Sequence, residues 1–350
     1  MGNILSNPTF IFGITFGVIL LLSVIGTRKS LGTVTAENFF SIKQTNWIKG
    51  FAIALVAFSH YYGNIGVTVT GAGYVGAFGV GVFFLCSGYG LTVSKLKKTD
   101  YAKGFLKNKL LRIYAPYTIA FIAEWLIVLL TPFSCDDNII INYLTISLPK
   151  ALIWYLKVQV TLYIVYYIML LISKNNNKLF CGGIFAISIA YMIIGFCVGL
   201  KPHWYQNALW FPIGIFIAMN KTTVYDFISK YFIRAVIITL FMFALGWGLI
   251  HFISGDVLHQ IIMIYGLIAF VVIISTKVCG SSKLMNFFGR HSIEIYFSHS
   301  MVSKCLGSYF IMDNLVWAFV FIIVSVLLAI PIKFLSNKIV KTVDTITVKK

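Results

Sequence analysis

Among the ionisable side chains that interrupt apolar stretches of this sequence, three are candidates for chemistry. His60 ends the run that begins at Trp47, and Glu294 and His299 lie in a second run near the C-terminus. Ionisable groups within membrane segments are costly and often functional. An imidazole with an ordinary pKa of about 6.5 can take a proton from an alcohol. His60 is therefore a candidate general base. The competing interpretation, a neutral imidazole bonded to a neighbouring hydroxyl or carbonyl, stays open.

The spacing of Glu294 and His299 indicates that they serve different neighbours. Five positions on one helix turn a side chain by about 140°. They therefore cannot form a simple pair one turn apart. We expect one of them to face the same cavity as His60 and the other to bind a neighbouring helix. Polar contact between helices, without chemistry, is the alternative for both.

Basic residues are concentrated between two apolar runs in the first third of the chain. They are Lys95, Lys97, Lys98, Lys103, Lys107, Lys109 and Arg112. A preference for positive charge at the cytoplasmic face accounts for a few lysines, but this run exceeds that need. It predicts a site either for a phosphorylated cytosolic ligand or for anionic lipid headgroups.

The composition defines the elements that must position these residues. The chain has 350 residues, of which 59% are hydrophobic and 11% are charged, and its mean hydropathy is +0.90. Soluble domains are about one-quarter charged, so a soluble enzyme, a disordered chain and a fibrous repeat are excluded. We predict an all-α polytopic membrane protein with about ten or eleven transmembrane helices. The predicted spans are 8–26, 47–64, 73–93, 112–131, 151–172, 179–199, 207–219, 232–252, 258–276, 291–306 and 312–332.

The distribution of basic residues predicts the orientation of these spans. Of the 28 lysines and arginines, all but four lie in the odd-numbered connections or the C-terminal tail. Short cytoplasmic loops are enriched in these residues, so the N-terminus is expected outside and the C-terminus in the cytoplasm. The net charge of +18 thereby has an explanation in membrane insertion, and we expect no nucleic-acid partner.

Other features predict a single integral membrane domain over residues 1–350 with no soluble domain. The six cysteines are scattered without metal-ligand spacing, so no metal is expected. Gly71, Gly73 and Gly76 fit the spacing of a dinucleotide-binding loop. However, they follow no strand and enter a span, so we interpret the match as chance.

Four segments in a fixed order resemble a known family. They are Asn46–His60, Tyr74–Gly90, Lys109–Tyr117 and Phe288–His299. Together they resemble the membrane acyltransferase-3 family, which O-acylates surface glycans, over roughly residues 40–310. The resemblance implies an enzyme that takes an acyl group, most often acetyl, from cytosolic acyl-CoA and passes it to a hydroxyl outside the membrane. It implies the plasma membrane, and the composition suggests a bacterium.

The resemblance also assigns roles to residues. His60 matches the family's catalytic histidine, and Lys109 and Arg112 match its donor-binding region. The predicted donor site is completed by Lys107 and Lys49 from the same lysine-rich mouth, because coenzyme A carries three phosphate groups. Ser87 is expected to orient the imidazole or hold the thioester carbonyl. His299, with Tyr296, matches the family's late tyrosine–histidine segment, and Glu294 completes the predicted catalytic set.

Two positions depart from the family pattern. Asn46 and Lys49 stand where family members often have aspartate and arginine, and Lys109 stands where many have arginine. A lysine offers a point charge rather than a fork of donors, so donor contacts are expected to differ in detail. Two other functions stay open at this point: an exporter of a glycan or lipid-linked sugar, and a noncatalytic partner in a polysaccharide biosynthesis complex.

Overall fold

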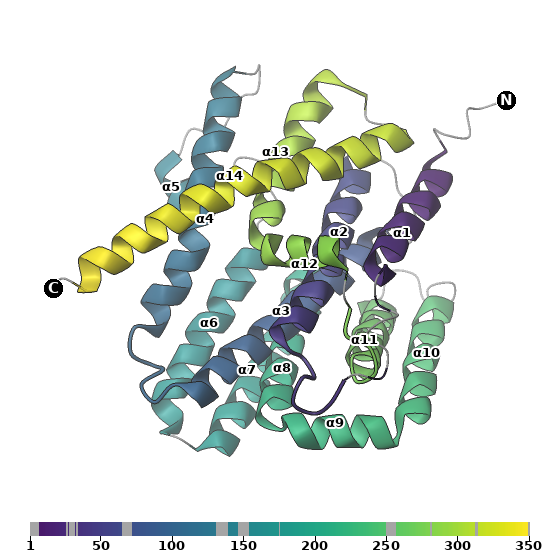
Figure 1. The fold of residues 1–350 in the computed structure, drawn as a ribbon, viewed down its shortest axis with the longest axis vertical. Coiled ribbons are helices and arrows are strands. Elements are labelled where there is room, and N and C mark those ends of the chain that lie inside the picture. Colours follow the sequence, from purple (N-terminus) through teal and green to yellow (C-terminus); the bar gives the residue numbers. More distant parts are fainter. Residues whose placement is uncertain are drawn as a thin grey trace.

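A computed structural model describes residues 7–25, 27, 32, 34–64, 72–130, 139–145, 154–174, 176–249, 257–280, 282–311 and 314–348. Within these residues the regular elements are helical (Figure 1). They are α1 (Pro8–Val24), α2 (Ile42–Asn64), α3 (Ala72–Lys97), α4 (Phe105–Leu130), α5 (Ile139–Leu144), α6 (Trp154–Ser173), α7 (Asn177–Cys197), η3 (Pro202–Trp204), α8 (Trp210–Met219), α9 (Lys221–Lys230), α10 (Phe232–Leu249), α11 (Val257–Ile274), α12 (Lys283–Arg290), α13 (Ser292–Tyr309) and α14 (Leu315–Val348).

The prediction of an all-α polytopic membrane protein is confirmed. Among the described residues, 7 helices are long and apolar enough to cross a membrane: α3, α4, α6, α7, α10, α11 and α14. Helices α1 and α8 are apolar but shorter. Helices α2 and α13 lie outside this set and carry His60, Glu294 and His299. Each predicted span therefore coincides with a helix, although not each one meets the length and hydropathy of a membrane crossing.

Helices α4 and α14 extend furthest beyond their predicted bounds. Helix α4 begins at Phe105 rather than at residue 112, and α14 continues to Val348 rather than ending at residue 332. The charged ends of both helices lack the apolar character on which the prediction depended. Lys107 and Lys109 consequently lie on a helix instead of in a loop. The predicted span ends at residues 26, 131, 151–153, 250–252 and 312 lie outside the described residues.

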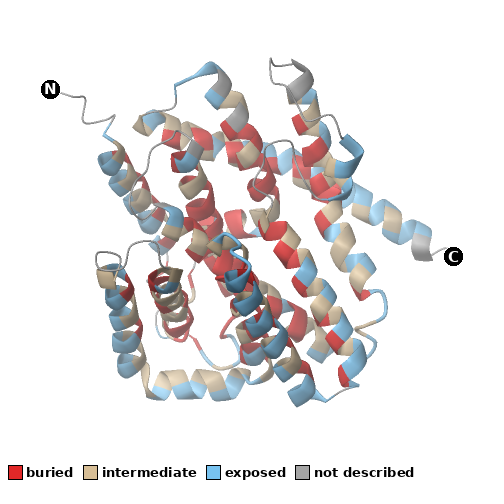
Figure 2. Ribbon diagram, turned by 180° about the vertical axis from the view of Figure 1, so that it is seen from behind, coloured by how far each residue is buried: buried red, intermediate tan, exposed pale blue. Residues whose placement is uncertain are grey.

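Helices α2 and α3 form the centre of the molecule. Of the most apolar part of α3, 72% is buried, whereas the corresponding part of α10 is 11% buried. Figure 2 shows this difference as a buried interior surrounded by helices with exposed outer faces. The packing partners of α3 are α2, α8 and α11, and those of α2 include α12 and α13. Residues on α2 and α3 are thus held by neighbours on several sides.

Glycines allow these central helices to approach closely. A side chain on Gly88 of α3 would overlap the backbone carbonyl of Phe211, and one on Gly214 of α8 would overlap that of Leu85. The backbones of α3 and α8 are therefore in direct contact along this seam. Such close approach through small residues is a common way for membrane helices to pack.

Helix α12 directs the chain into α13. Its first turn is capped by Ser282, whose hydroxyl accepts a hydrogen bond from the backbone N–H of Met285. Gly289, near its end, lies against the backbone of Asn46 on α2. The chain then turns at His291 and enters α13, which packs against α2, α4 and α14. This contact fixes the register at which α13 faces α2.

Candidate active site

Two histidines from distant parts of the chain meet in the interior. The Nδ1 atom of His60 on α2 lies 2.6 Å from the Nε2 atom of His299 on α13. Their ring centroids are 4.8 Å apart. The sequence predicted that either Glu294 or His299 would face the same cavity as His60, and His299 is the one that contacts His60.

The hydrogen-bond partners assign the protons of this pair. The Nδ1 atom of His299 lies 3.2 Å from the carbonyl oxygen of Ile295, one turn earlier. A carbonyl only accepts, so Nδ1 of His299 carries the proton and its Nε2 accepts. The proton between the rings then belongs to Nδ1 of His60. This arrangement leaves Nε2 of His60 with a lone pair, which is the electronic state that a general base requires.

The surroundings of the pair are largely apolar and aromatic. The His299 side chain is buried, and its ring lies 5.5 Å from that of Tyr296 and 6.5 Å from that of Phe321. His60 is partly exposed. Of the two imidazoles, His60 is therefore the one that a second reactant can approach.

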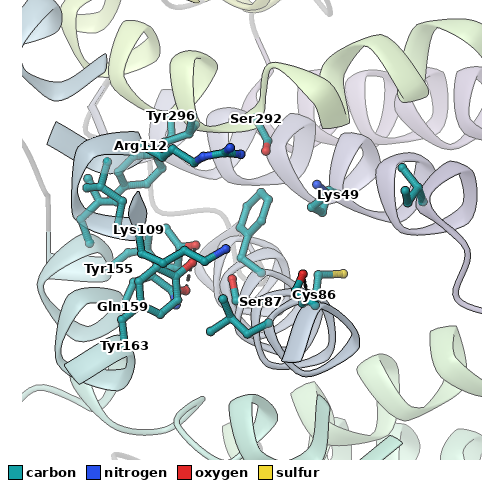
Figure 3. A pocket seen from close by; sticks show the side chains of 18 residues that line it. Lys49, Cys86, Ser87, Lys109, Arg112, Tyr155, Gln159, Tyr163, Ser292 and Tyr296 are labelled. Atoms are coloured by element: carbon teal, nitrogen blue, oxygen red, sulfur yellow. Dashed lines mark hydrogen bonds between the residues drawn. The ribbon is translucent and has the colours of Figure 1, made fainter. Parts of the chain in front are cut away.

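A cavity of about 560 Å³ opens beside these helices (Figure 3). Four residues predicted from the sequence line it: Lys49 from α2, Ser87 from α3, and Lys109 and Arg112 from α4. Figure 3 shows the Lys109 amine and the Arg112 guanidinium directed into this space. Three of its lining side chains are thus cationic, and the described lining includes no aspartate or glutamate. We refer to this space as the basic cavity; its charge favours an anionic ligand.

Lys107 is not among the cations that line the basic cavity. Its side chain is exposed and is not part of the described lining, although its neighbours Lys109 and Arg112 are. The reason is helical periodicity. On a helix that begins at Phe105, residues 109 and 112 lie three apart on one face, whereas residue 107 is two positions from 109 and points elsewhere.

Aromatic rings line the basic cavity, and one of them contacts the histidine pair. Phe83, Tyr155 and Tyr296 line the cavity, and the Tyr155 ring lies 5.8 Å from Phe83 and 5.3 Å from Tyr296. We call these three residues the aromatic wall. Tyr296 also contacts His299. A ligand that fills the cavity would therefore end one aromatic ring away from the two imidazoles.

Glu294 has a different neighbour from His299. Its carboxylate lies 3.6 Å from the Lys333 amine on α14, and that amine also donates a hydrogen bond to the backbone carbonyl of Arg290. The Glu294 side chain is buried. The structure thus places Glu294 in an ion pair between α13 and α14, rather than in contact with either histidine. A catalytic role for Glu294 stays a prediction.

Sequence reasoning missed the contribution of α6 to the cavity. Tyr155, Gln159 and Tyr163 project from this helix into the lining. Gln159 carried a usable signal, because an amide within an apolar span is costly unless something binds it. The tyrosines carried none, since aromatic residues are frequent in membrane helices. Ser87, which was predicted, lies on the facing helix α3 (Figure 3).

The fold and site define a polytopic helical membrane protein with a cavity lined by cations and a candidate base nearby. In the described part of the chain, no cluster of three metal-ligating side chains occurs. Residues 42–334 match the family model Acyl_transf_3, described as an acyltransferase domain. The chain belongs to this acyltransferase family, which confirms the resemblance found in the sequence and supports an enzyme rather than an exporter.

The family match makes the chain a multi-pass membrane acyltransferase. The matched region extends from the start of α2 into α14, and so it includes every residue of the basic cavity and the histidine pair. No curated protein and no solved structure matches the chain.

Proposed function

We propose that the protein transfers an acyl group, acetyl in the simplest case, from cytosolic acyl-CoA to a hydroxyl of an extracytoplasmic or lipid-linked glycan. The observation that carries this proposal is that Tyr296 both lines the basic cavity and contacts His299 of the histidine pair. The cavity suits a phosphorylated donor, and His60 suits the activation of an alcohol. Membership of an acyltransferase family gives these two features a common reaction.

The cations are proposed to bind the phosphates of coenzyme A. Arg112 offers a planar fork of donors that matches phosphate oxygens, whereas Lys109 and Lys49 act as point charges. Lys49 lies eleven residues before His60 on α2, which is about 16 Å along the helix. A donor whose phosphates lie among these cations would direct its thioester toward the aromatic wall.

His60 is proposed to act as general base and then as general acid. Its Nε2 takes the proton of the acceptor hydroxyl while the hydroxyl oxygen attacks the thioester carbonyl carbon. The carbon–sulfur bond then breaks, and the departing coenzyme A thiolate receives the proton from Nε2. The products are an ester and free coenzyme A, and the histidine regains its starting state. His299 holds the His60 ring and stabilises the transient imidazolium.

The two sides of the reaction follow from the proposed orientation. With the C-terminus in the cytoplasm, the basic ends of α3 and α4 face the pool of acyl-CoA. His60 then lies toward the outer half of the membrane, where a glycan hydroxyl can reach it. We place the protein in the bacterial plasma membrane, alone or within a polysaccharide biosynthesis complex.

Transfer of labelled acetyl from acetyl-CoA to extracted surface glycan tests the proposal. Purified protein in lipid vesicles should label the glycan, and His60→Ala should reduce the rate about 10²- to 10⁴-fold, the usual contribution of a general base. His203→Ala is the matched control, because His203 packs against Trp154 outside the site. Normal transfer by His60→Ala at equal protein amount would refute the assigned base.

A further inference from the structure

An unpaired amide lies at the edge of the basic cavity. The Gln159 side chain on α6 is only 2% exposed. Its Oε1 atom accepts a hydrogen bond from the Tyr155 hydroxyl at 3.3 Å. Its Nε2 atom has no hydrogen-bond partner among the described residues. Buried polar groups are nearly always hydrogen-bonded, so an unpaired amide donor here indicates a partner that binds from the cavity.

The position of Gln159 along the cavity restricts that partner. Gln159 lies one helical turn from Tyr155, which belongs to the aromatic wall, and shares the lining with Lys109 and Ser87 (Figure 3). It therefore lies close to the wall end of the cavity. The bond to Tyr155 engages the amide oxygen, so the NH₂ group is left to bind a ligand. Because Gln159 lies next to the aromatic wall, toward which the acyl end of the donor is proposed to point, a carbonyl oxygen is the acceptor within its reach.

We propose that Gln159 Nε2 donates a hydrogen bond to a carbonyl oxygen of the acyl donor. The inference rests on the proposed function, because it takes an acyl-CoA as the occupant of the cavity. Such a donor carries a thioester carbonyl at its reactive end and amide carbonyls along its pantetheine arm. Cations at the cavity bind the phosphate end, and Gln159 fixes the depth at which the arm lies. Gln159 is thus a donor-binding residue that no charge pattern reveals.

Binding measurements with three ligands test this inference. The dissociation constants of acetyl-CoA, free coenzyme A and S-ethyl-CoA, a thioether without the thioester carbonyl, would be measured on the purified full chain. Gln159→Met removes the amide at similar volume, and it should weaken acetyl-CoA binding about five- to tenfold, the effect of one buried neutral hydrogen bond. Ser188→Ala is the matched control. It removes another buried, unpaired polar group, on α7, and should leave all three constants unchanged.

The pattern across ligands identifies the carbonyl. A loss confined to acetyl-CoA assigns the thioester carbonyl, whereas an equal loss for all three ligands assigns a pantetheine amide. Gln159→Leu repeats the measurement with a second apolar side chain, and thermal unfolding shows that each variant is folded. If the wild type binds acetyl-CoA and both Gln159 variants bind it with the same dissociation constant, the inference is overturned. Absence of acetyl-CoA binding by the wild type would instead refute the proposed function.

Discussion

At the scale of single residues, one backbone carbonyl determines which nitrogen is free for chemistry. The Ile295 carbonyl holds the proton on Nδ1 of His299, and His299 in turn holds the proton on Nδ1 of His60. The lone pair on Nε2 of His60 is therefore set by contacts on the far side of the ring. An imidazole without this partner would exchange between two tautomers, of which one cannot accept a proton at Nε2.

Replacing His299 should therefore slow catalysis without weakening donor binding. We expect His299→Leu to reduce kcat at least about tenfold, because His60 then loses its orienting partner and the stabilisation of its charged form. The KM for acyl-CoA should stay close to that of the wild type. His299→Gln should recover part of the rate, since its amide oxygen can accept the His60 proton. A rise in KM equal to the fall in kcat would indicate general damage to the fold.

Replacing Arg112 should weaken donor binding, in contrast to replacing His299, which should lower kcat. Hydrogen bonds to charged groups contribute about 1.5–3 kcal/mol, so Arg112→Ala should weaken acetyl-CoA binding roughly tenfold to a hundredfold. The affinity of Arg112→Lys for acetyl-CoA should lie between those of the wild type and Arg112→Ala, because lysine keeps the charge and loses the planar fork of donors. Lys103→Ala provides the control, since Lys103 is exposed between α3 and α4. Equal effects of the Lys103 and Arg112 substitutions would point to diffuse attraction instead of a defined site.

At the scale of helices, the placement of the site depends on the seam between α3 and α8. Gly88 lies on this seam, one position after Ser87 of the cavity. We expect Gly88→Ala to destabilise the protein by about 1–3 kcal/mol, the usual cost of overpacking, because its methyl group would overlap the Phe211 carbonyl. Gly73→Ala on the same helix meets no atom within 4 Å and should be neutral. Thermal unfolding in one detergent compares the Gly88→Ala and Gly73→Ala variants. Equal melting temperatures would contradict a close contact between α3 and α8 at Gly88.

The sequence predicts these helices better than it predicts their ends. Hydropathy locates α6 and α7 within a few residues, because their apolar runs stop close to where the helices stop. It fails at α4 and α14, whose helical hydrogen bonding continues through lysines. It also fails at α12, which is short and amphipathic, so no apolar run marks it. Helix formation and membrane burial are separate properties, and hydropathy reports only the second.

At the scale of the whole molecule, the site is assembled by contacts that no local pattern encodes. His60 and His299 are 239 positions apart, so spacing cannot reveal their contact, and the family resemblance supplied it only as two separate matches. The cations Lys109 and Arg112 could be predicted because they form one turn of one helix. The partnership of Glu294 with Lys333 could not be predicted, because it depends on how α14 packs against α13, which no local pattern reveals.

The orientation of the molecule is open to a direct test. A fluorescent protein that matures only in the cytoplasm should fluoresce when it is fused after residue 350. Alkaline phosphatase, which requires an oxidising compartment for its disulfides, should be inactive at the same position. The same two reporters fused before residue 1 should give the reverse pattern. The opposite result would place the basic cavity on the side without acyl-CoA.

The aromatic wall has a consequence for the energy balance of the cell. A base reached by water from both faces of a membrane can pass protons from one side to the other, as chains of ionisable groups do in pumps. Rings of Phe83, Tyr155 and Tyr296 line the basic cavity, and Tyr296 also contacts His299. Packed rings at this point would interrupt a continuous file of water. Under the proposed function, such a wall would let the enzyme move an acyl group across a charged bilayer without discharging the electrochemical gradient that the same membrane maintains.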